Sequence, residues 1–304
     1  MKTGLAALVT ALLLLPGIAQ ADELPMKAEA PITLTSPSAI LCEASTGQVI
    51  FEKNADERRP VASVNKVMTI LLTLEAVDEG RVSLEDQVTV SPRAASMGGS
   101  QAFLDAGERY KLSELLKTVI VASANDSAVA LAEHLAGTEE SFVRLMNTRA
   151  EELGLTNTHY ANCTGLPAQE HYTTARDVAK LSAQLDLHPI YYRYSTIWMD
   201  EIKHRGGRVT SLTNTNRLIR FYPGCDGYKT GSTNEARYCV SATAKKEGMR
   251  LIAVVLGTPA GQTRFDEARA MLEYGFANVQ LVTPIAQGQA LDMTVPVRLG
   301  GRDE

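Results

Sequence analysis

The stretch Pro60-Val-Ala-Ser-Val-Asn-Lys-Val-Met-Thr-Ile70 decides the fold, because it starts a helix and places a hydroxyl and an amine one turn apart. A proline stands at its head, apolar residues recur with helical spacing and a glycine follows, so we predict one helix over residues 61–80. Ser63 falls in the first turn, where unpaired N–H groups favour developing negative charge. Lys66, three residues on, lies on the same face and can reach the Ser63 hydroxyl.

Ser63 and Lys66 therefore form a candidate nucleophile and base. A hydroxyl is a poor nucleophile until a neighbour removes its proton, and a lysine does so only when its pKa is lowered. Burial beside a second cation lowers that pKa, and Lys229 is the candidate for the second charge. Taken alone, the same spacing is typical of a serine cap beside a solvent-facing lysine. The interpretation thus depends on the other motifs of the chain.

The second motif, Ser123-Ala-Asn125, lies between two apolar runs with helical patterning, Leu112 to Val121 and Ser127 to Leu135. We predict a short connection between packed helices, a rigid loop of the kind that often carries catalytic groups. A hydroxyl there can relay a proton between Lys66 and a leaving amine, and the Asn125 amide can hold a neighbouring group in place. The alternative is that Ser123 or Asn125 only caps the following helix.

The third motif, Lys229-Thr-Gly231, falls in a predicted antiparallel sheet segment. Alternation and β-branched content predict strands over residues 227–233, 238–244 and 250–256, with Asn234-Glu-Ala236 as the first turn. Lys229 and Thr230 on an edge strand can grip a substrate carboxylate, and Gly231 lets a backbone approach closely. The alternative is a lysine that protects an exposed edge from aggregation.

The S-x-x-K, S-x-N and K-T-G set is shared by penicillin-binding proteins and class A β-lactamases. With these motifs in order, the chain resembles the low-molecular-mass penicillin-binding proteins, the serine D-alanyl-D-alanine carboxypeptidases of the peptidase S11 type. The resemblance runs from about Pro37 to Phe276. The segments that carry it are Pro37–Asn54, which looks like an opening hairpin turned at Ser45-Thr-Gly47, Val61–Thr69, Ala122–Ala132 and Asp226–Gly231.

The resemblance implies a role for each matching residue. Ser63 corresponds to the acylated nucleophile, Lys66 to the general base and Ser123 to the proton relay. The implied substrate-binding residues are Asn125, Lys229, Thr230, Gly231, Ser232 and Arg264. Among them Lys229 and Thr230 bind the terminal D-Ala carboxylate, with Arg264 nearby, and the backbone N–H groups of Ser63 and Ser232 form the oxyanion hole. Arg217 is a weaker match to a family arginine.

The fold class that follows is mixed α/β (α+β) of the β-lactamase/transpeptidase-like type. We expect an antiparallel sheet, built from the opening hairpin and the three strands after Asp226, with helices on both faces and Ser63 starting a buried central helix. Further helices are predicted over residues 174–187, after a Thr173 cap, and over residues 264–276.

Three segments are predicted along the chain. Residues 1–21 read as a signal peptide, with Lys2, an apolar run and an Ala19-Gln-Ala21 cleavage pattern, which predicts an extracytoplasmic protein. Residues 22–278 form the catalytic domain. Residues 279–304 look like the start of an incomplete β-rich domain; because the family's amphipathic anchor would come later, membrane association stays open.

Composition excludes several other classes of function. The net charge of −5 over 304 residues carries no nucleic-acid signal. The four cysteines form no C-x-x-C pair, and Cys225 and Cys239 fall out of register on neighbouring strands, so we expect neither zinc nor a disulfide between them. Four of the five histidines lie scattered over the middle of the chain without ligand spacing: His159, His171, His188 and His204. We therefore expect no metal and no cofactor.

The function that this sequence predicts is removal of the terminal D-Ala from peptidoglycan stem peptides, with β-lactam antibiotics as inhibitors. A DD-endopeptidase or transpeptidase using the same site is the main alternative, since only the acceptor and leaving peptide differ. A β-lactamase is less favoured, because Glu151–Asn157 does not match the E-x-x-L-N pattern of class A enzymes. A binding protein without turnover is a further alternative. The third residue of the preferred stem peptide and the oligomeric state stay open.

Overall fold

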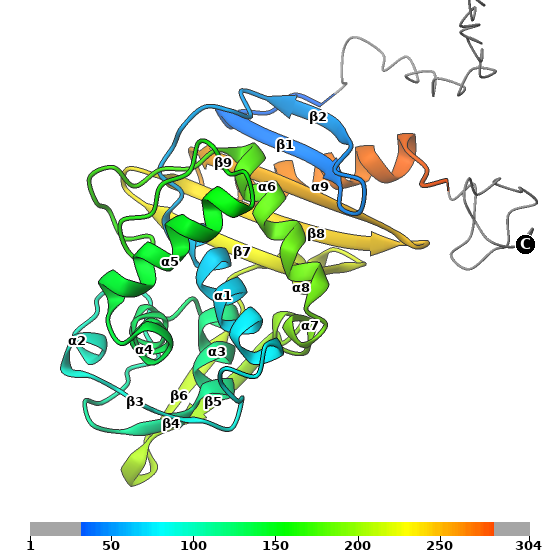
Figure 1. The fold of residues 1–304 in the computed structure, drawn as a ribbon. Helices are drawn as coiled ribbons and strands as arrows, with labels where there is room; N and C mark the ends of the chain where they lie inside the picture. The colour runs from blue at the N-terminus through cyan, green and yellow to red at the C-terminus, as the bar shows by residue number, and fades with distance from the viewer. Residues whose placement is uncertain (1–31, 283–304) are drawn as a thin grey trace, which may run out of the picture. The chain divides into compact units, whose positions relative to one another are not determined.

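An antiparallel sheet of five strands forms the centre of the structure, a computed structural model that describes residues 32–282 (Figure 1). Its strands, in the spatial order β2-β1-β9-β8-β7, are β1 Ser38–Glu43, β2 Val49–Lys53, β7 Cys225–Thr233, β8 Arg237–Lys246 and β9 Met249–Thr258. β1 pairs with β9, with Ser38 opposite Leu256 and Glu43 opposite Leu251. The opening hairpin and the last three strands therefore meet in one sheet, as predicted.

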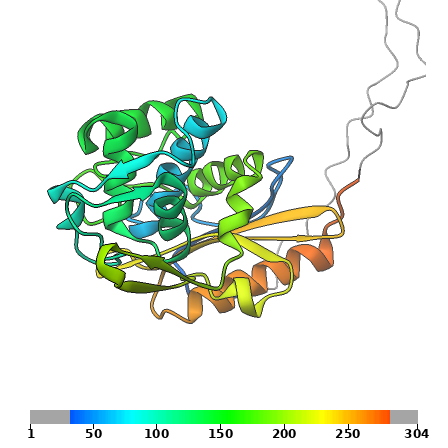
Figure 2. The same cartoon turned by 90° about the horizontal axis from the view of Figure 1, so that it is seen from below.

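Helices cover both faces of this sheet. The larger group lies on one face and consists of η1 Ala62–Asn65, α1 Lys66–Asp78, α2 Pro92–Ala95, α3 Leu112–Val121, α4 Asn125–Ala136, α5 Glu139–Glu152, α6 Ala175–Gln184, η2 Leu185–Leu187 and α7 Ile190–Ser195. The other face packs against α9 Thr263–Asn278, with α8 Leu218–Phe221 beside it (Figure 2). This two-sided cover confirms the predicted fold class.

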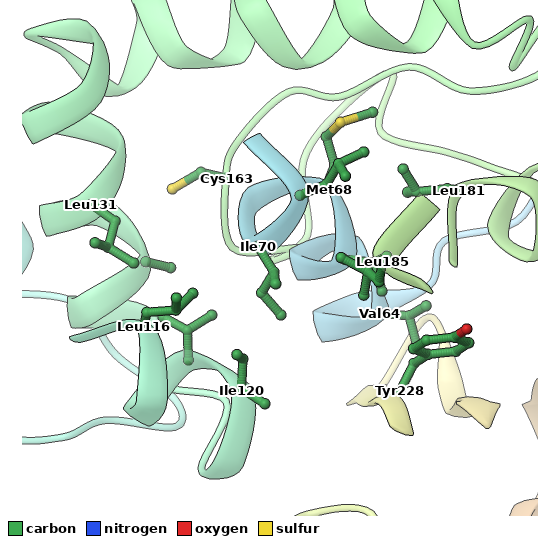
Figure 3. Close-up of a cluster of buried hydrophobic side chains, with 14 of the residues drawn as sticks. Val64, Met68, Ile70, Leu116, Ile120, Leu131, Cys163, Leu181, Leu185 and Tyr228 are labelled. Carbon is green, nitrogen blue, oxygen red and sulfur yellow. The ribbon is translucent and has the colours of Figure 1, made fainter. Parts of the chain in front are cut away.

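Two apolar cores result from the alternation of side chains along the strands. In β1, Ile40 and Cys42 point into the core under the larger helical group, whereas Ala39 and Leu41 point into the core under α9. Figure 3 shows part of the first core, where Met68 and Ile70 of α1 lie among side chains from neighbouring helices. Each central strand is thus buried on both faces.

α1 is the buried central helix. Its apolar side chains are almost completely shielded from solvent: Val67, Met68, Ile70, Leu71 and Leu74. The predicted single helix over residues 61–80 differs in its first turn, which is the 3₁₀ turn η1. There Ala62 has a φ of 50° and Val64 N–H bonds to the Val61 carbonyl at 3.2 Å, because this turn packs directly against β7. Gly80 ends the helix with a φ of 70°, as predicted.

Several elements were not predicted from the sequence. Two short ribbons, β3 Gln87–Thr89 with β4 Arg109–Lys111 and β5 Met199–Lys203 with β6 Val209–Thr213, bury one side chain per strand and therefore carry little pattern. A 3₁₀ turn, η3 Arg205–Gly207, joins the strands of the second ribbon. The predicted Thr173 cap was wrong by one residue: the Thr174 hydroxyl accepts from Asp177 N–H at 3.1 Å, and the α-helix ends at Gln184.

The cysteines confirm the expected register. Cys239 pairs with Gly231 and Cys225 with Ala244, at opposite ends of the β7–β8 hairpin, and all four cysteines are free and buried. The predicted signal peptide at residues 1–21 and nearly all of the predicted β-rich segment at 279–304 lie outside the described residues. The described helices include none with the length and apolarity needed to cross a membrane.

Two glycines allow backbone to close on both sides of the η1 turn. A Cβ on Gly231 of β7 would lie 2.4 Å from the Val61 carbonyl oxygen and 2.9 Å from the Ser63 nitrogen. A Cβ on Gly165, whose φ is 81°, would lie 2.0 Å from the Ala62 carbonyl oxygen. Both distances are shorter than van der Waals contact allows, so glycine is required at each position.

We expect Gly165→Ala to destabilise the protein by about 2–4 kcal/mol, because a backbone clash adds to the cost of a left-handed alanine. Gly154→Ala is the matched control: its φ is 65° and no atom lies within 4 Å of the new Cβ, so its cost should be only about 1 kcal/mol. Urea unfolding of both variants measures the difference. Equal destabilisation of the two variants would contradict the predicted clash between the new Cβ at position 165 and the Ala62 carbonyl oxygen.

Candidate active site

Ser63 and Lys66 lie together at the start of the central helix. The Lys66 Nζ donates to the Ser63 Oγ at 2.9 Å and to the Thr164 carbonyl at 2.7 Å. Lys66 has no exposed surface, whereas Ser63 is partly exposed. Burial lowers the pKa of Lys66 to about 7, and the nearby Cys163 and Asp126 offset this only in part. Near neutral pH a substantial fraction of Lys66 is therefore a free amine, hydrogen-bonded to the hydroxyl that it would deprotonate.

Lys229 supplies a second buried amine in the site. It projects from the edge strand β7, is only 1% exposed, and its Nζ donates to the Thr230 carbonyl at 3.2 Å. Burial lowers its pKa well below the usual range, and the charges of Lys66 and Arg264 lower it further. The charge of Lys66 thus lowers the pKa of Lys229, whereas the predicted effect of Lys229 on Lys66 is not found: burial is what lowers the Lys66 pKa. An incoming carboxylate would reverse the effect by favouring the charged form of Lys229.

The loop between α3 and α4 presents two polar atoms without partners. Ser123 adopts a φ of 64°, and within residues 32–282 its Oγ and the Asn125 Oδ1 are buried without a hydrogen-bond partner. Such groups are rare in folded proteins, because burial without a partner costs about 1–3 kcal/mol. The Asn125 side chain is anchored at its other end, where Nδ2 donates to the Gly98 carbonyl at 2.7 Å. A bound substrate could satisfy both free atoms.

Asp126 holds this loop against the segment that precedes it. Its carboxylate accepts from the Ala102 N–H at 3.0 Å and the Leu104 N–H at 3.1 Å. The side chain is completely buried, so these bonds fix the wall of the site next to Asn125. This role of Asp126 was not predicted from the sequence, where the available signal was an acidic residue in the first turn of a buried helix.

A second loop, residues 162–172, closes the site from the other side. The Asn65 side chain donates to the Asn162 carbonyl at 3.2 Å, and its Oδ1 lies 2.9 Å from His171 Nε2. Burial lowers the pKa of His171 to about 4, so the ring is neutral near pH 7 and donates from Nε2 to the amide oxygen. These contacts fix the loop that carries the Thr164 carbonyl. Nothing in the sequence pattern pointed to His171 or Thr164.

The remaining predicted residues line or support β7. The Thr230 hydroxyl donates to the Thr215 hydroxyl at 2.7 Å, a contact that the sequence did not predict. Ser232 is exposed on β7, next to Gly231. Arg264, in the first turn of α9, donates from Nη1 to the carbonyls of Gly231 at 2.9 Å and Cys239 at 3.3 Å.

Arg264 therefore holds the β7 backbone at the point where it faces Ser63. Arg217, the weaker candidate, donates instead to the Gln262 side chain at 3.0 Å. Among the described residues no group of three or more His, Cys, Asp or Glu side chains is arranged to hold a metal ion. The assembled groups are a hydroxyl, two amines with lowered pKa values and unpartnered polar atoms, which suit acyl transfer through a serine ester.

Comparisons with known proteins agree with this chemistry. Residues 25–260 match the model of the peptidase S11 family, D-alanyl-D-alanine carboxypeptidase. The chain is 45% identical over 243 residues to the D-alanyl-D-alanine carboxypeptidase DacF of Bacillus subtilis, covering 80% of this chain and 62% of that protein. Two solved structures superpose well. The carboxypeptidase DacD of Francisella tularensis has a TM-score of 0.78 and 31% identity, over 82% of this chain and 72% of the other.

The second solved structure is penicillin binding protein 5 of Haemophilus influenzae, which has a TM-score of 0.77 and 32% identity to this chain. That match covers 82% of this chain and 73% of the other. The chain thus spans less than two thirds of the length of the Bacillus relative and nearly three quarters of the two solved chains.

The pKa of Lys66 predicts how acylation of Ser63 depends on pH. Because the base must be unprotonated, the second-order rate constant should rise about tenfold per pH unit below pH 7 and level off above it. Stopped-flow acylation by a fluorescent penicillin between pH 5 and 8 measures this profile. Circular dichroism at each pH provides the control for folding. A rate independent of pH over this range would assign the base to another group.

Proposed function

Since the chain belongs to the peptidase S11 family of D-alanyl-D-alanine carboxypeptidases, we propose that it removes the terminal D-Ala from peptidoglycan pentapeptides through an acyl-Ser63 intermediate. One observation carries the proposal: the buried Lys66 Nζ lies 2.9 Å from the Ser63 Oγ and has a lowered pKa. A neutral amine in this position can accept the hydroxyl proton at physiological pH.

The reaction proceeds in two steps. Lys66 takes the Ser63 proton as the Oγ attacks the carbonyl carbon of the penultimate D-Ala, and the carbon–nitrogen bond then breaks. The leaving D-Ala amine receives a proton from Lys66 through the free Ser123 hydroxyl. Water then hydrolyses the Ser63 ester and releases the shortened peptide. The Ser63 and Ser232 N–H groups stabilise the oxyanion in both steps, which is worth about 3–4 kcal/mol per donor in related chemistry.

Substrate binding depends on the terminal carboxylate. Lys229 receives it together with the Thr230 hydroxyl, whose hydrogen turns from Thr215 to the carboxylate, and the negative charge restores the protonated form of Lys229 against the effect of burial. Arg264 supports binding indirectly. It donates a hydrogen bond to the Gly231 carbonyl, which holds β7 in place, and it adds a positive charge behind this strand. Asn125, with its free Oδ1, holds the peptide on the opposite side.

Penicillins should inhibit the protein at this same site. A β-lactam carries a carboxylate and a reactive amide, so it acylates Ser63 in the same way as the peptide. The class A deacylation pattern E-x-x-L-N is missing at Glu151–Asn157, so the ester should persist.

Because peptidoglycan lies outside the cytoplasm, the protein acts there, consistent with the signal peptide predicted over residues 1–21.

Transpeptidation or endopeptidase cleavage is the second candidate. Both proceed through the same Ser63 ester and differ from carboxypeptidation only in the acceptor or in the leaving peptide. The observation that favours carboxypeptidation is the buried Lys229 amine with the partly buried Arg264 guanidinium nearby, basic groups that suit a free terminal carboxylate rather than an internal peptide bond.

Lys66→Ala should abolish acylation, lowering the rate constant by at least about 10³-fold, because the general base is lost. Labelling of Ser63 by a fluorescent penicillin measures it. Lys180→Ala, a change at an exposed position on α6, is the matched control and should acylate like the wild type. Ordinary labelling of a folded Lys66→Ala variant would place the base elsewhere, with Ser123 next in line.

Amidation of the substrate C-terminus should lower kcat/KM about 30-fold or more, since loss of one partner of a buried charge pair costs about 2–5 kcal/mol. Lys229→Ala should cause a similar loss on the free acid, and the amide should then cost that variant little more. Lys245→Ala, an exposed lysine in the same sheet, is the control. Mass spectrometry of the products identifies the bond cleaved. If free-acid and amidated peptides react equally well, the enzyme is an endopeptidase.

A further inference from the structure

A small cavity lies between α8 and the first turns of α9, on the face of the sheet opposite the larger helical group (Figure 2). Its volume is about 240 Å³, and it is lined by Arg217, Leu218, Phe221, Gln262, Phe265 and Arg269. Leu218 and Phe265 belong to the core under α9, whereas Ser63 and Lys66 start the helix on the other face. The cavity is therefore separate from the proposed catalytic chemistry.

Two guanidinium groups in this cavity have no acidic partner. Among residues 32–282 neither Arg217 nor Arg269 forms an ion pair. The carboxylate of Asp266, the acidic residue next to Phe265, accepts from the Gln262 amide at 2.9 Å and does not line the cavity. The cavity thus carries two positive charges that the described part of the protein leaves without a counter-charge.

The two arginines are held in place but keep free donors. Arg217 Nη1 donates to the Gln262 side chain at 3.0 Å, and its guanidinium lies 5.9 Å from the centroid of the Phe221 ring. Arg269 Nη2 donates to the Phe221 carbonyl at 3.0 Å, and its Nε is buried without a hydrogen-bond partner in the described structure. Buried donors without partners are rare, because they are costly, and they mark positions where a ligand is gained cheaply.

The charge of the cavity indicates which anion fits. A phosphate monoester carries a charge of about −1.5 to −2 near pH 7, which balances two guanidinium groups. A carboxylate carries a single charge, and one arginine fork is enough to satisfy it. The remaining lining is apolar, from Leu218, Phe221 and Phe265, and therefore suits an organic group attached to the phosphate. A volume of 240 Å³ equals that of about eight water molecules, enough for a phosphate with one small ring.

We propose that this cavity binds a phosphate monoester with an apolar organic group. The phosphate lies between Arg217 and Arg269, and the organic group packs against Phe221 and Phe265. The phosphate belongs either to a soluble ester or to a lipid headgroup such as phosphatidate, which present the same chemistry. The proposed carboxypeptidase reaction does not involve this ligand, so the cavity is a second binding site of the protein.

Phenyl phosphate is a suitable probe, and Trp198 reports its binding. Trp198 is the only tryptophan of the chain, and its ring centroid lies 5.9 Å from that of Phe221 in the cavity wall. We expect calorimetry and Trp198 fluorescence to give a Kd of about 0.1–1 mM for phenyl phosphate. Inorganic phosphate lacks the apolar group and benzoate has the smaller charge, so each should bind about tenfold more weakly.

Variants assign the binding to this cavity. Arg217→Gln and Arg269→Gln should each weaken phenyl phosphate about tenfold, because each removes a charged hydrogen-bond donor. Phe221→Ala, followed by calorimetry, should reduce the advantage of phenyl phosphate over inorganic phosphate. Arg109→Gln is the matched control, since Arg109 is exposed on β4 and does not line the cavity. Circular dichroism shows whether each variant is folded.

Two further measurements locate the ligand and its source. Titration of protein acylated with a penicillin, whose active site is filled, should give the same Kd as the free protein. Sedimentation with vesicles of phosphatidylcholine and phosphatidate separates the two sources. Sedimentation that Arg217→Gln abolishes identifies a lipid headgroup, whereas protein that stays in solution but binds phenyl phosphate identifies a soluble ester.

Three results would overturn the inference. The first is that the wild-type protein does not bind phenyl phosphate, or binds it as tightly as both arginine variants do. The second is that acylation by penicillin abolishes binding, which would place the anion in the active site instead. The third is that benzoate binds as tightly as phenyl phosphate, which would contradict selection for phosphate. None of these results changes the proposed carboxypeptidase function.

Discussion

The burial of the Lys66 amine without a carboxylate partner is the constraint on which the rest of the structure depends. Taking an ammonium group out of water is costly, and its partners are the neutral Ser63 hydroxyl and Thr164 carbonyl. A carboxylate in contact would keep the amine protonated, and Lys66 could not act as the base that we propose. The site gains reactivity by forgoing an ion pair, so the stability of this region must come from elsewhere in the fold.

The two apolar cores supply that stability and fix the position of Ser63. α1 lies at the centre of the larger core, with helices around it and the sheet beneath it. Gly231 of β7 and Gly165 of the closing loop bring backbone against both sides of the η1 turn, where any larger residue would clash. Close packing of backbone on backbone keeps the serine from shifting, and productive acyl transfer requires that precision.

Polar groups in the site differ in whether they have hydrogen-bond partners. Asp126 and the Asn65–His171 pair, which hold walls of the site, have hydrogen-bond partners, whereas the buried Nε of Arg264 has none within the described residues. The Ser123 Oγ and the Asn125 Oδ1, to which the proposed mechanism gives roles toward the substrate, lack partners within the described residues. The protein accepts a cost in stability at these atoms, which is the usual relation between a functional site and the fold that supports it.

The sequence by itself determined the central helix, the β7–β8 hairpin with its register, and the pairing of Ser63 with Lys66, because each depends on local periodicity, turn residues or an i, i+3 spacing. Only the tertiary structure decided the partners of these groups. Thr164, His171 and Thr215 reach the site from loops, whose positions depend on contacts between residues far apart in the chain and leave no periodic signal. The tertiary structure also decided the lowered pKa of Lys66, since burial is a property of the packed core rather than of the sequence around the lysine.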